Sequence, residues 1–125
     1  MSSERPRGRA PTPQQAIESA IRLGHRASAR VANDTLETYL ANEERQDSIE
    51  RLLLRFGEAL NSLPADVLTA ISPTVEWDKP IRFRDLAAHW YEDGLDHQLI
   101  WNVLQHDLPP LVAALEAYLA DLKNA

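Results

Sequence analysis

The chain has 125 residues, a formal net charge of −6 at pH 7 and no cysteine, and this length suits one domain. The lack of cysteine excludes disulfides, thiol catalysis and cysteine-ligated zinc, and no run of about 18 apolar residues is present to span a membrane. The acidic balance argues against a broad surface for coating nucleic acid, which usually needs a basic excess, but permits a small cationic site.

The first twelve residues are predicted to form a disordered basic tail. Arg5, Arg7 and Arg9 lie there among proline and glycine, and the absence of an apolar run argues against a secretory signal. Residues 13–124 are predicted to form a single helical domain. A small domain without disulfides fits the cytoplasm.

Thr12 followed by Pro13 is typical of a helix start, and apolar residues then recur at helical spacing. We expect a helix over residues 13–31. Asp34 and Glu37 fit a capping box for a short second helix that ends at residue 40.

A second long helix is predicted over residues 43–63, followed by a shorter piece from Pro64 to residue 71. Residues 74–79 are expected to form a loop or turn. Pro80 suits the first turn of the next helix, which should extend to about Tyr91.

Asp96 is a candidate N-cap for the helix that follows. Pro109 and Pro110 should interrupt or kink that helix, because neither ring leaves an amide donor. A final amphipathic helix is expected over residues 111–122. No segment alternates with period two, so the predicted fold is all-α, an up-and-down bundle of four to five helices.

The search for chemistry excludes several kinds of site. The chain has no glycine-rich phosphate loop and no HExxH motif. Its histidines follow no spacing typical of a metal site, so neither a metal nor another cofactor is expected. The histidines are His25, His89, His97 and His106.

Residues 81–91, IRFRDLAAHWY, gather two arginines, a histidine and a tyrosine. Cleaving RNA without a metal requires a group that moves protons and a cation that stabilises phosphate charge. His89 is a candidate for the first role, because histidine titrates near neutral pH. Arg84 is a candidate for the second, because its guanidinium presents a fixed fork of donors to phosphate.

On an ideal helix, Arg84 and His89 point about 140° apart and lie about 7.5 Å apart along the axis. Two copies related by a twofold axis can pool both side chains in one cleft, so a homodimer is predicted. Asp85 shares a face with His89 and is expected to orient its imidazole. Arg82, seven residues before His89, is a second candidate phosphate contact.

The same cluster also fits a solvated helix face with local ion pairs, which is its more common role. The large aromatic residues are expected to pack in the core or at an interface, more often than to stack on bases. They are Trp77, Phe83, Trp90 and Trp101.

The motif from Arg84 through His89 to Tyr91 resembles the R-x4-H-x-Y signature of HepT-like proteins in the HEPN superfamily. Downstream, Asp96, Trp101 and the Asp-Leu-Pro step at 107–109 follow the family's order. The resemblance covers nearly the whole chain. It implies a HEPN-like all-α homodimer that is a metal-independent endoribonuclease toxin.

The resemblance also implies residue roles. Arg84 and His89 would be catalytic, with RNA cut by attack of its own 2′-hydroxyl. The antitoxin partner of such proteins, MntA, is a minimal nucleotidyltransferase that adds AMP to the motif tyrosine, here Tyr91, in a type VII-like toxin–antitoxin system. Asp85 stands where the family most often has Asn, and Trp90 replaces a small residue. These departures bear on substrate access.

Two alternatives stay open. The chain can be a non-catalytic binding subunit, or a nucleotide-binding partner, of a nucleotidyltransferase, which the acidic surface favours. It can also be a structural helical dimer. The intact set of Arg84, His89 and Tyr91 favours the enzyme.

Overall fold

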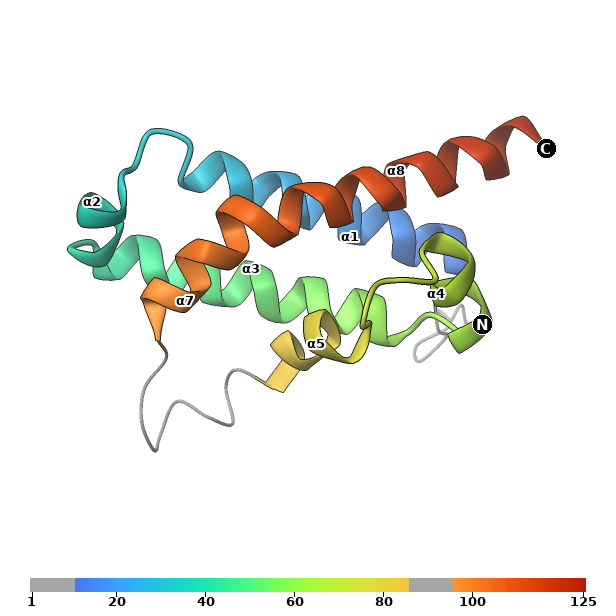
Figure 1. Cartoon of the computed structure of the whole chain (residues 1–125), viewed down its shortest axis with the longest axis horizontal. Coiled ribbons are helices and arrows are strands. Elements are labelled where there is room, and N and C mark those ends of the chain that lie inside the picture. The colour runs from blue at the N-terminus through green and yellow to red at the C-terminus, as the bar shows by residue number, and fades with distance from the viewer. Residues whose placement is uncertain (1–10, 86–95) are drawn as a thin grey trace, which may run out of the picture.

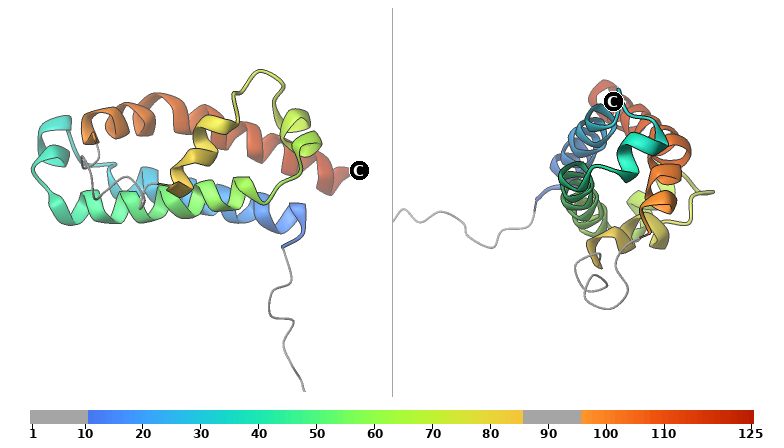
Figure 2. Two further views of the ribbon diagram at one scale, coloured as in Figure 1. Left: turned by 90° about the horizontal axis from the view of Figure 1, so that it is seen from below. Right: turned by 90° about the vertical axis from the view of Figure 1, so that its left-hand side faces the viewer.

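Three long helices make up most of the computed structural model, which describes residues 11–85 and 96–125. They are α1 (Pro13–Arg30), α3 (Glu43–Asn61) and α8 (Leu108–Asn124). They lie side by side, and α1 is antiparallel to the other two (Figures 1 and 2). The described residues contain no strand, which confirms the predicted all-α bundle.

The start of α1 is set by local hydrogen bonds. The Thr12 hydroxyl accepts from the Gln15 amide at 3.1 Å, and the Gln15 side chain accepts from the Thr12 amide at 3.0 Å. This reciprocal box satisfies two amides that the helix cannot pair. Thr12 is thus the N-cap of α1, as predicted. Residues 1–10 of the predicted tail lie outside the described residues.

The predicted capping box of α2 (Leu36–Leu40) is wrong by one residue. Thr35 is the N-cap, and its hydroxyl accepts from the Thr38 amide at 3.2 Å. Asp34 instead accepts from the Thr38 hydroxyl at 3.0 Å and pairs with Arg45 at 2.5 Å. Asp34 therefore pairs with Arg45 of α3 and does not cap α2, although the sequence pattern predicted it as the cap.

The core lies between α1, α3 and α8. Gly24 on α1 allows α8 to approach closely, since a Cβ there would lie 2.5 Å from Val112 Cγ2. The largest side chains that are fully excluded from water are Ile17, Tyr39, Ile49, Leu53, Phe56, Leu60, Leu108 and Leu115.

The segment between α3 and the second half of the bundle contains short elements. After α4 (Ala65–Ile71), Trp77 is buried, and its indole donates to the Ser72 carbonyl at 3.0 Å. This contact confirms a packing role for Trp77. The helix α5 (Asp78–Ile81) begins before the predicted Pro80.

A continuous α-helix from Pro80 to Tyr91 is also wrong. The chain tightens into a 3₁₀ turn, η1 (Arg82–Asp85), directly after α5. The tighter turn lies where the backbone passes close to α3 at Gly57. Residues 86–91 of the predicted helix lie outside the described residues.

The prolines interrupt the next helix as predicted, in the form of a π turn. After α7 (His97–Asn102), the residues Val103–Asp107 form η2, and the Leu108 amide donates to the Val103 carbonyl, five residues back. Pro109 and Pro110 follow and have no amide to continue the α pattern. Consequently α8 begins at Leu108, three residues before the predicted start. None of the described helices is long and apolar enough to cross a bilayer.

Candidate functional site

Arg84 is positioned by a close approach between η1 and α3. A Cβ at Gly57 would lie 2.6 Å from the Arg84 backbone nitrogen and 3.0 Å from the Ile81 carbonyl. Only glycine therefore admits the η1 backbone at this place. Ile81 and Phe83 pack against the core from the same segment, which fixes the backbone that carries Arg84.

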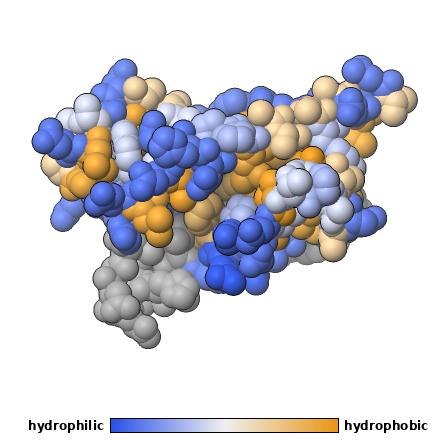
Figure 3. Space-filling model, viewed as in Figure 1, coloured by the Kyte–Doolittle hydropathy of each residue, from blue (hydrophilic) through white to orange (hydrophobic). Residues whose placement is uncertain are grey.

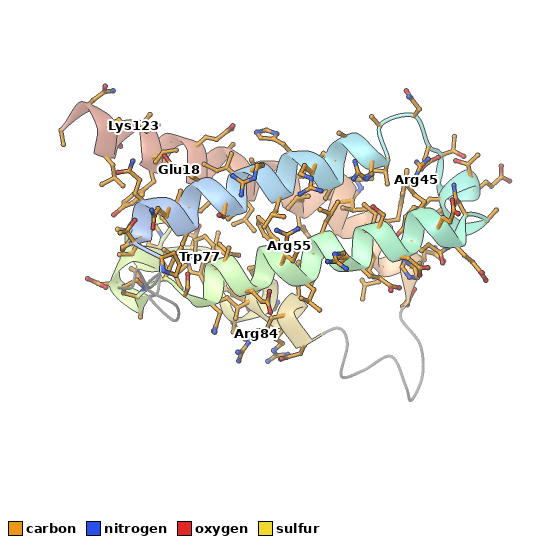
Figure 4. All side chains as sticks on the ribbon, turned by 180° about the vertical axis from the view of Figure 1, so that it is seen from behind. Glu18, Arg45, Arg55, Trp77, Arg84 and Lys123 are labelled. Carbon is orange, nitrogen blue, oxygen red and sulfur yellow. The ribbon has the colours of Figure 1, made fainter. Side chains whose placement is uncertain are left out.

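The Arg84 guanidinium remains open to solvent. Its side chain is 45% exposed, and Nε lies 3.9 Å from Asp85 Oδ1, at the outer limit of an ion pair. Figure 4 shows Arg84 at the edge of the molecule beside α3. Most of its donors can therefore reach an external anion such as phosphate.

Arg82 is more loosely held. Its guanidinium lies 3.4 Å from the Asp78 carboxylate, and both side chains are largely exposed. A 3₁₀ helix has three residues per turn and not 3.6. The angles predicted from Arg82, Arg84 and Asp85 to His89 assumed one α-helix, whereas these three residues lie in a 3₁₀ turn. The relations to His89 itself stay predictions. His89, Trp90 and Tyr91 lie outside the described residues.

A buried polar chain lies where the described structure resumes. His97 Nε2 is 2.5 Å from Glu50 Oε2, and His97 Nδ1 is 2.7 Å from the Tyr39 hydroxyl. The Tyr39 ring also packs on Trp101, with centroids 5.5 Å apart. Asp96 caps α7 by accepting from two amides, as predicted.

The chemistry of Glu50 and Tyr39 together indicates the direction of these hydrogen bonds. Burial, then the nearby Glu50 and Asp34 carboxylates, raises the pKa of Tyr39 well above its ordinary value. A carboxylate only accepts, so Nε2–H of His97 donates to Glu50. The phenol of Tyr39 stays neutral and can donate to Nδ1 of His97. The sequence analysis did not predict these hydrogen bonds, because Tyr39, Glu50 and His97 form no common sequence motif.

The α3 residues that contact Arg84 and His97, Gly57 and Glu50, lie on one face of that helix. Glu50 and Gly57 are seven residues apart, which places them two turns and about 10.5 Å apart on the same side of a helix. The described residues before the gap, up to Asp85, and those after it, from Asp96, therefore both lie beside this face of α3. The motif residues His89 and Tyr91 belong to the stretch between these two points.

A cleft of about 640 Å³ lies between the α5–η1 segment and the junction of α7 with α8. Figure 3 shows apolar surface gathered there beneath α8. The lining is mostly aliphatic and aromatic and includes Val75, Lys79, Phe83, His106 and Leu111. In the part of the chain that the structure describes, no three potential metal ligands come together.

Comparison with known proteins agrees with the motif. The family model "Ribonuclease HepT-like" matches residues 17–118. A protein named "Putative RNase MJ0127", from Methanocaldococcus jannaschii, is 28% identical over 90 residues, covering 72% of this chain and 73% of that protein. No solved structure matches the chain. The family match spans well over half of the sequence, and the chain therefore belongs to the ribonuclease HepT-like family.

Proposed function

We propose that this chain is a metal-independent endoribonuclease that acts as a cytoplasmic toxin, built as one domain over residues 13–124. The observation that carries the proposal is the exposed guanidinium of Arg84 on a backbone fixed against Gly57. The family match and the RNase name of the similar protein support RNA as the substrate.

In the proposed reaction, the 2′-oxygen of a ribose forms a bond to the adjacent phosphorus, and the bond to the 5′-oxygen of the next nucleotide breaks. His89 accepts the 2′-hydroxyl proton, and a protonated imidazole supplies a proton to the leaving oxygen. Arg84 stabilises the charge on the phosphate oxygens. Asp85 and Arg82 support these two groups. The products are a 2′,3′-cyclic phosphate and a 5′-hydroxyl.

The site is proposed to be completed by a second copy of the chain. Two proton-transfer steps are served best by two imidazoles, and a twofold axis supplies one from each protomer. Leu99 on α7 is 60% exposed, an apolar side chain available for such an interface. Light scattering at micromolar concentration should give a dimer, and a monomer of about half that mass would contradict the shared site.

The cleavage proposal is tested with purified protein and single-stranded RNA in excess EDTA. Cleavage should persist, and the variants Arg84→Ala and His89→Ala should each lose about 10² to 10⁴ in rate while melting like the parent. Activity that vanished with the chelator and returned with magnesium would overturn the mechanism.

Control of the toxin is proposed to act through Tyr91. An MntA-like nucleotidyltransferase antitoxin would add AMP to its phenol in a type VII-like system. The added phosphate can pair with Arg84 or Arg82 by charge-assisted hydrogen bonds and occupy the position of an RNA phosphate. On co-expression, intact mass should show one or more added AMP groups on the parent and none on Tyr91→Phe, which should remain toxic.

The alternative is a non-catalytic binding subunit or nucleotide-binding partner of a nucleotidyltransferase. The net charge of −6 favours it, because an acidic surface repels RNA at long range. The same assay separates the two functions. A parent protein that cuts no RNA, yet still binds a nucleotidyltransferase, would support the binding subunit.

A further inference from the structure

Five arginines on α1 and α3 have no carboxylate partner among the ion pairs formed by the described residues. This is unexpected in a chain whose net charge is −6. We call this set the arginine face. Its members are Arg22, Arg26 and Arg30 on α1, and Arg51 and Arg55 on α3.

The arginine face follows the line along which α1 packs beside α3. Its members are spaced four residues apart on each helix, so neighbours lie about 6 Å apart along the axis on nearly one side. The two helices are joined at one end of the row, where Arg30 Nε donates to the Ser48 hydroxyl at 3.0 Å. Figure 4 looks onto this side and labels Arg55 between the two helices.

Three carboxylates lie about one turn from members of the arginine face, so they reduce its charge but are fewer than its five arginines. On α1, Glu18 is four residues before Arg22 and pairs with Lys123 of α8, and His25 pairs with Glu116 of α8. Glu50 is buried against His97. Asp47 and Glu58 are exposed on α3, four residues before Arg51 and three residues after Arg55.

The arginine face and the proposed cleavage site lie on two sides of the same helix, α3. Arg55 and Gly57 are two residues apart on α3, which places them about 160° apart around the helix, and Gly57 is the point where the backbone of Arg84 crosses that helix. Figure 4 labels Arg55 on the side of α3 toward α1 and Arg84 on the other side of α3. A strand held by the arginine face must therefore pass around the exposed side of α3, about one helix diameter of 10–12 Å, to reach Arg84.

We propose that the arginine face binds the phosphate backbone of the RNA substrate away from the cut, while Arg84 contacts the phosphate that is cleaved. A row of guanidinium groups suits a repeating phosphate chain, because each offers a fork of donors without reading the base. The proposal rests on the proposed ribonuclease function and adds to it a place where a long strand is held.

The test compares two double variants that remove the same charge. Arg26→Gln with Arg55→Gln alters the arginine face, whereas Lys79→Gln with Lys123→Gln removes two lysines elsewhere. Binding of a labelled single-stranded RNA of about 30 nucleotides is measured in EDTA at several salt concentrations. Each lost phosphate contact should lower the salt slope by about 0.7, so the arginine variant should lose about 1.4 and the lysine variant much less.

A reverse variant sharpens the result. Asp47→Asn with Glu58→Gln removes the two acidic neighbours on α3 and should strengthen RNA binding. Equal weakening by the arginine and lysine variants would overturn the arginine face as a specific site. A changed oligomeric mass with an unchanged salt slope would also overturn it, and would identify this side as a protein interface.

Cleavage of a dinucleotide separates this proposal from the proposed function. A dinucleotide is too short to reach the arginine face, so the arginine variant should cut it at the parent rate and lose activity only on the long strand. If the parent binds long RNA through these arginines but cuts neither substrate, the ribonuclease function fails and the binding face stands. If the parent cuts the dinucleotide but does not bind the long strand, the binding face fails.

Discussion

Along α1, α3 and α8, large apolar side chains are excluded from water, whereas α5 and η1 contain no fully buried residue. The α5–η1 segment has exposed ion pairs, half-buried Ile81 and Phe83, and one close backbone contact at Gly57. The bundle therefore supplies the stability of the molecule. The geometry of Arg84 depends on how this partly exposed segment packs against α3.

The largest effect should follow from emptying the core. Phe56 is fully buried on α3, and Phe56→Ala should lower the free energy of unfolding by about 3–5 kcal/mol, since it removes apolar contacts and leaves a cavity. Leu122→Ala, at a position that is 40% exposed, is the control and should cost much less. Urea denaturation measures the free energy of unfolding of both variants. An equal decrease in the two would contradict the assignment of Phe56 to the core.

Breaking the polar chain beside α7 should have the next largest effect. His97→Ala leaves the buried carboxylate of Glu50 without its partner, which should destabilise the fold by about 1–3 kcal/mol. His25→Ala removes a similar but exposed pair with Glu116 and should cost less than about 1 kcal/mol. Indistinguishable melting of the two variants would mean that the buried chain contributes nothing.

Tyr39 should make stability depend on alkaline pH. Folding raises the pKa of Tyr39, so the unfolded chain loses this proton first. The contribution of Tyr39 to the free energy of unfolding is complete below the ordinary tyrosine pKa of about 10. Above that pH it should fall by up to about 1.4 kcal/mol per pH unit. In an absorbance titration, one phenol should ionise only when the protein unfolds. A normal titration of all the tyrosines would contradict this assignment, and Tyr39→Phe should remove the late step.

Two glycines allow the bundle and the α5–η1 segment to be disturbed separately. Gly57→Ala forces the backbone of Arg84 to move, whereas Gly24→Ala pushes on the Val112 side chain in the core. Overpacking costs about 1–3 kcal/mol, and each change regains about 1 kcal/mol of helix propensity. Both variants should remain folded. Only Gly57→Ala should lower the rate of RNA cleavage per folded molecule. An equal loss of cleavage in Gly24→Ala would show that activity does not depend on the position of Arg84.

The smallest effect on stability should come from the surface of the α5–η1 segment. Arg82→Gln removes the exposed pair with Asp78 and should change the free energy of unfolding by less than about 1 kcal/mol. Its effect on RNA cleavage should exceed its effect on melting if Arg82 supports Arg84. Asp78→Asn breaks the same pair without removing the cation and should leave cleavage unchanged.

Local rules in the sequence determined much of the bundle. The caps at Thr12 and Asp96 and the apolar spacing of α1 and α3 each depend on residues within a few positions of one another, so they could be predicted correctly. The motif led to the family and to Arg84 as a candidate residue. The roles of His89 and Tyr91 stay predictions, because both lie outside the described residues.

Only the tertiary structure decided the features that join distant parts of the chain. Tyr39 and His97 are 58 positions apart, and Glu50 and His97 are 47 apart, so no local pattern announces their hydrogen bonds. Arg45 likewise draws Asp34 away from the cap, and η1 adopts its tight turn against Gly57. Each depends on which surfaces of two helices meet, and that choice is made by burial of the whole apolar core and not by neighbours in sequence.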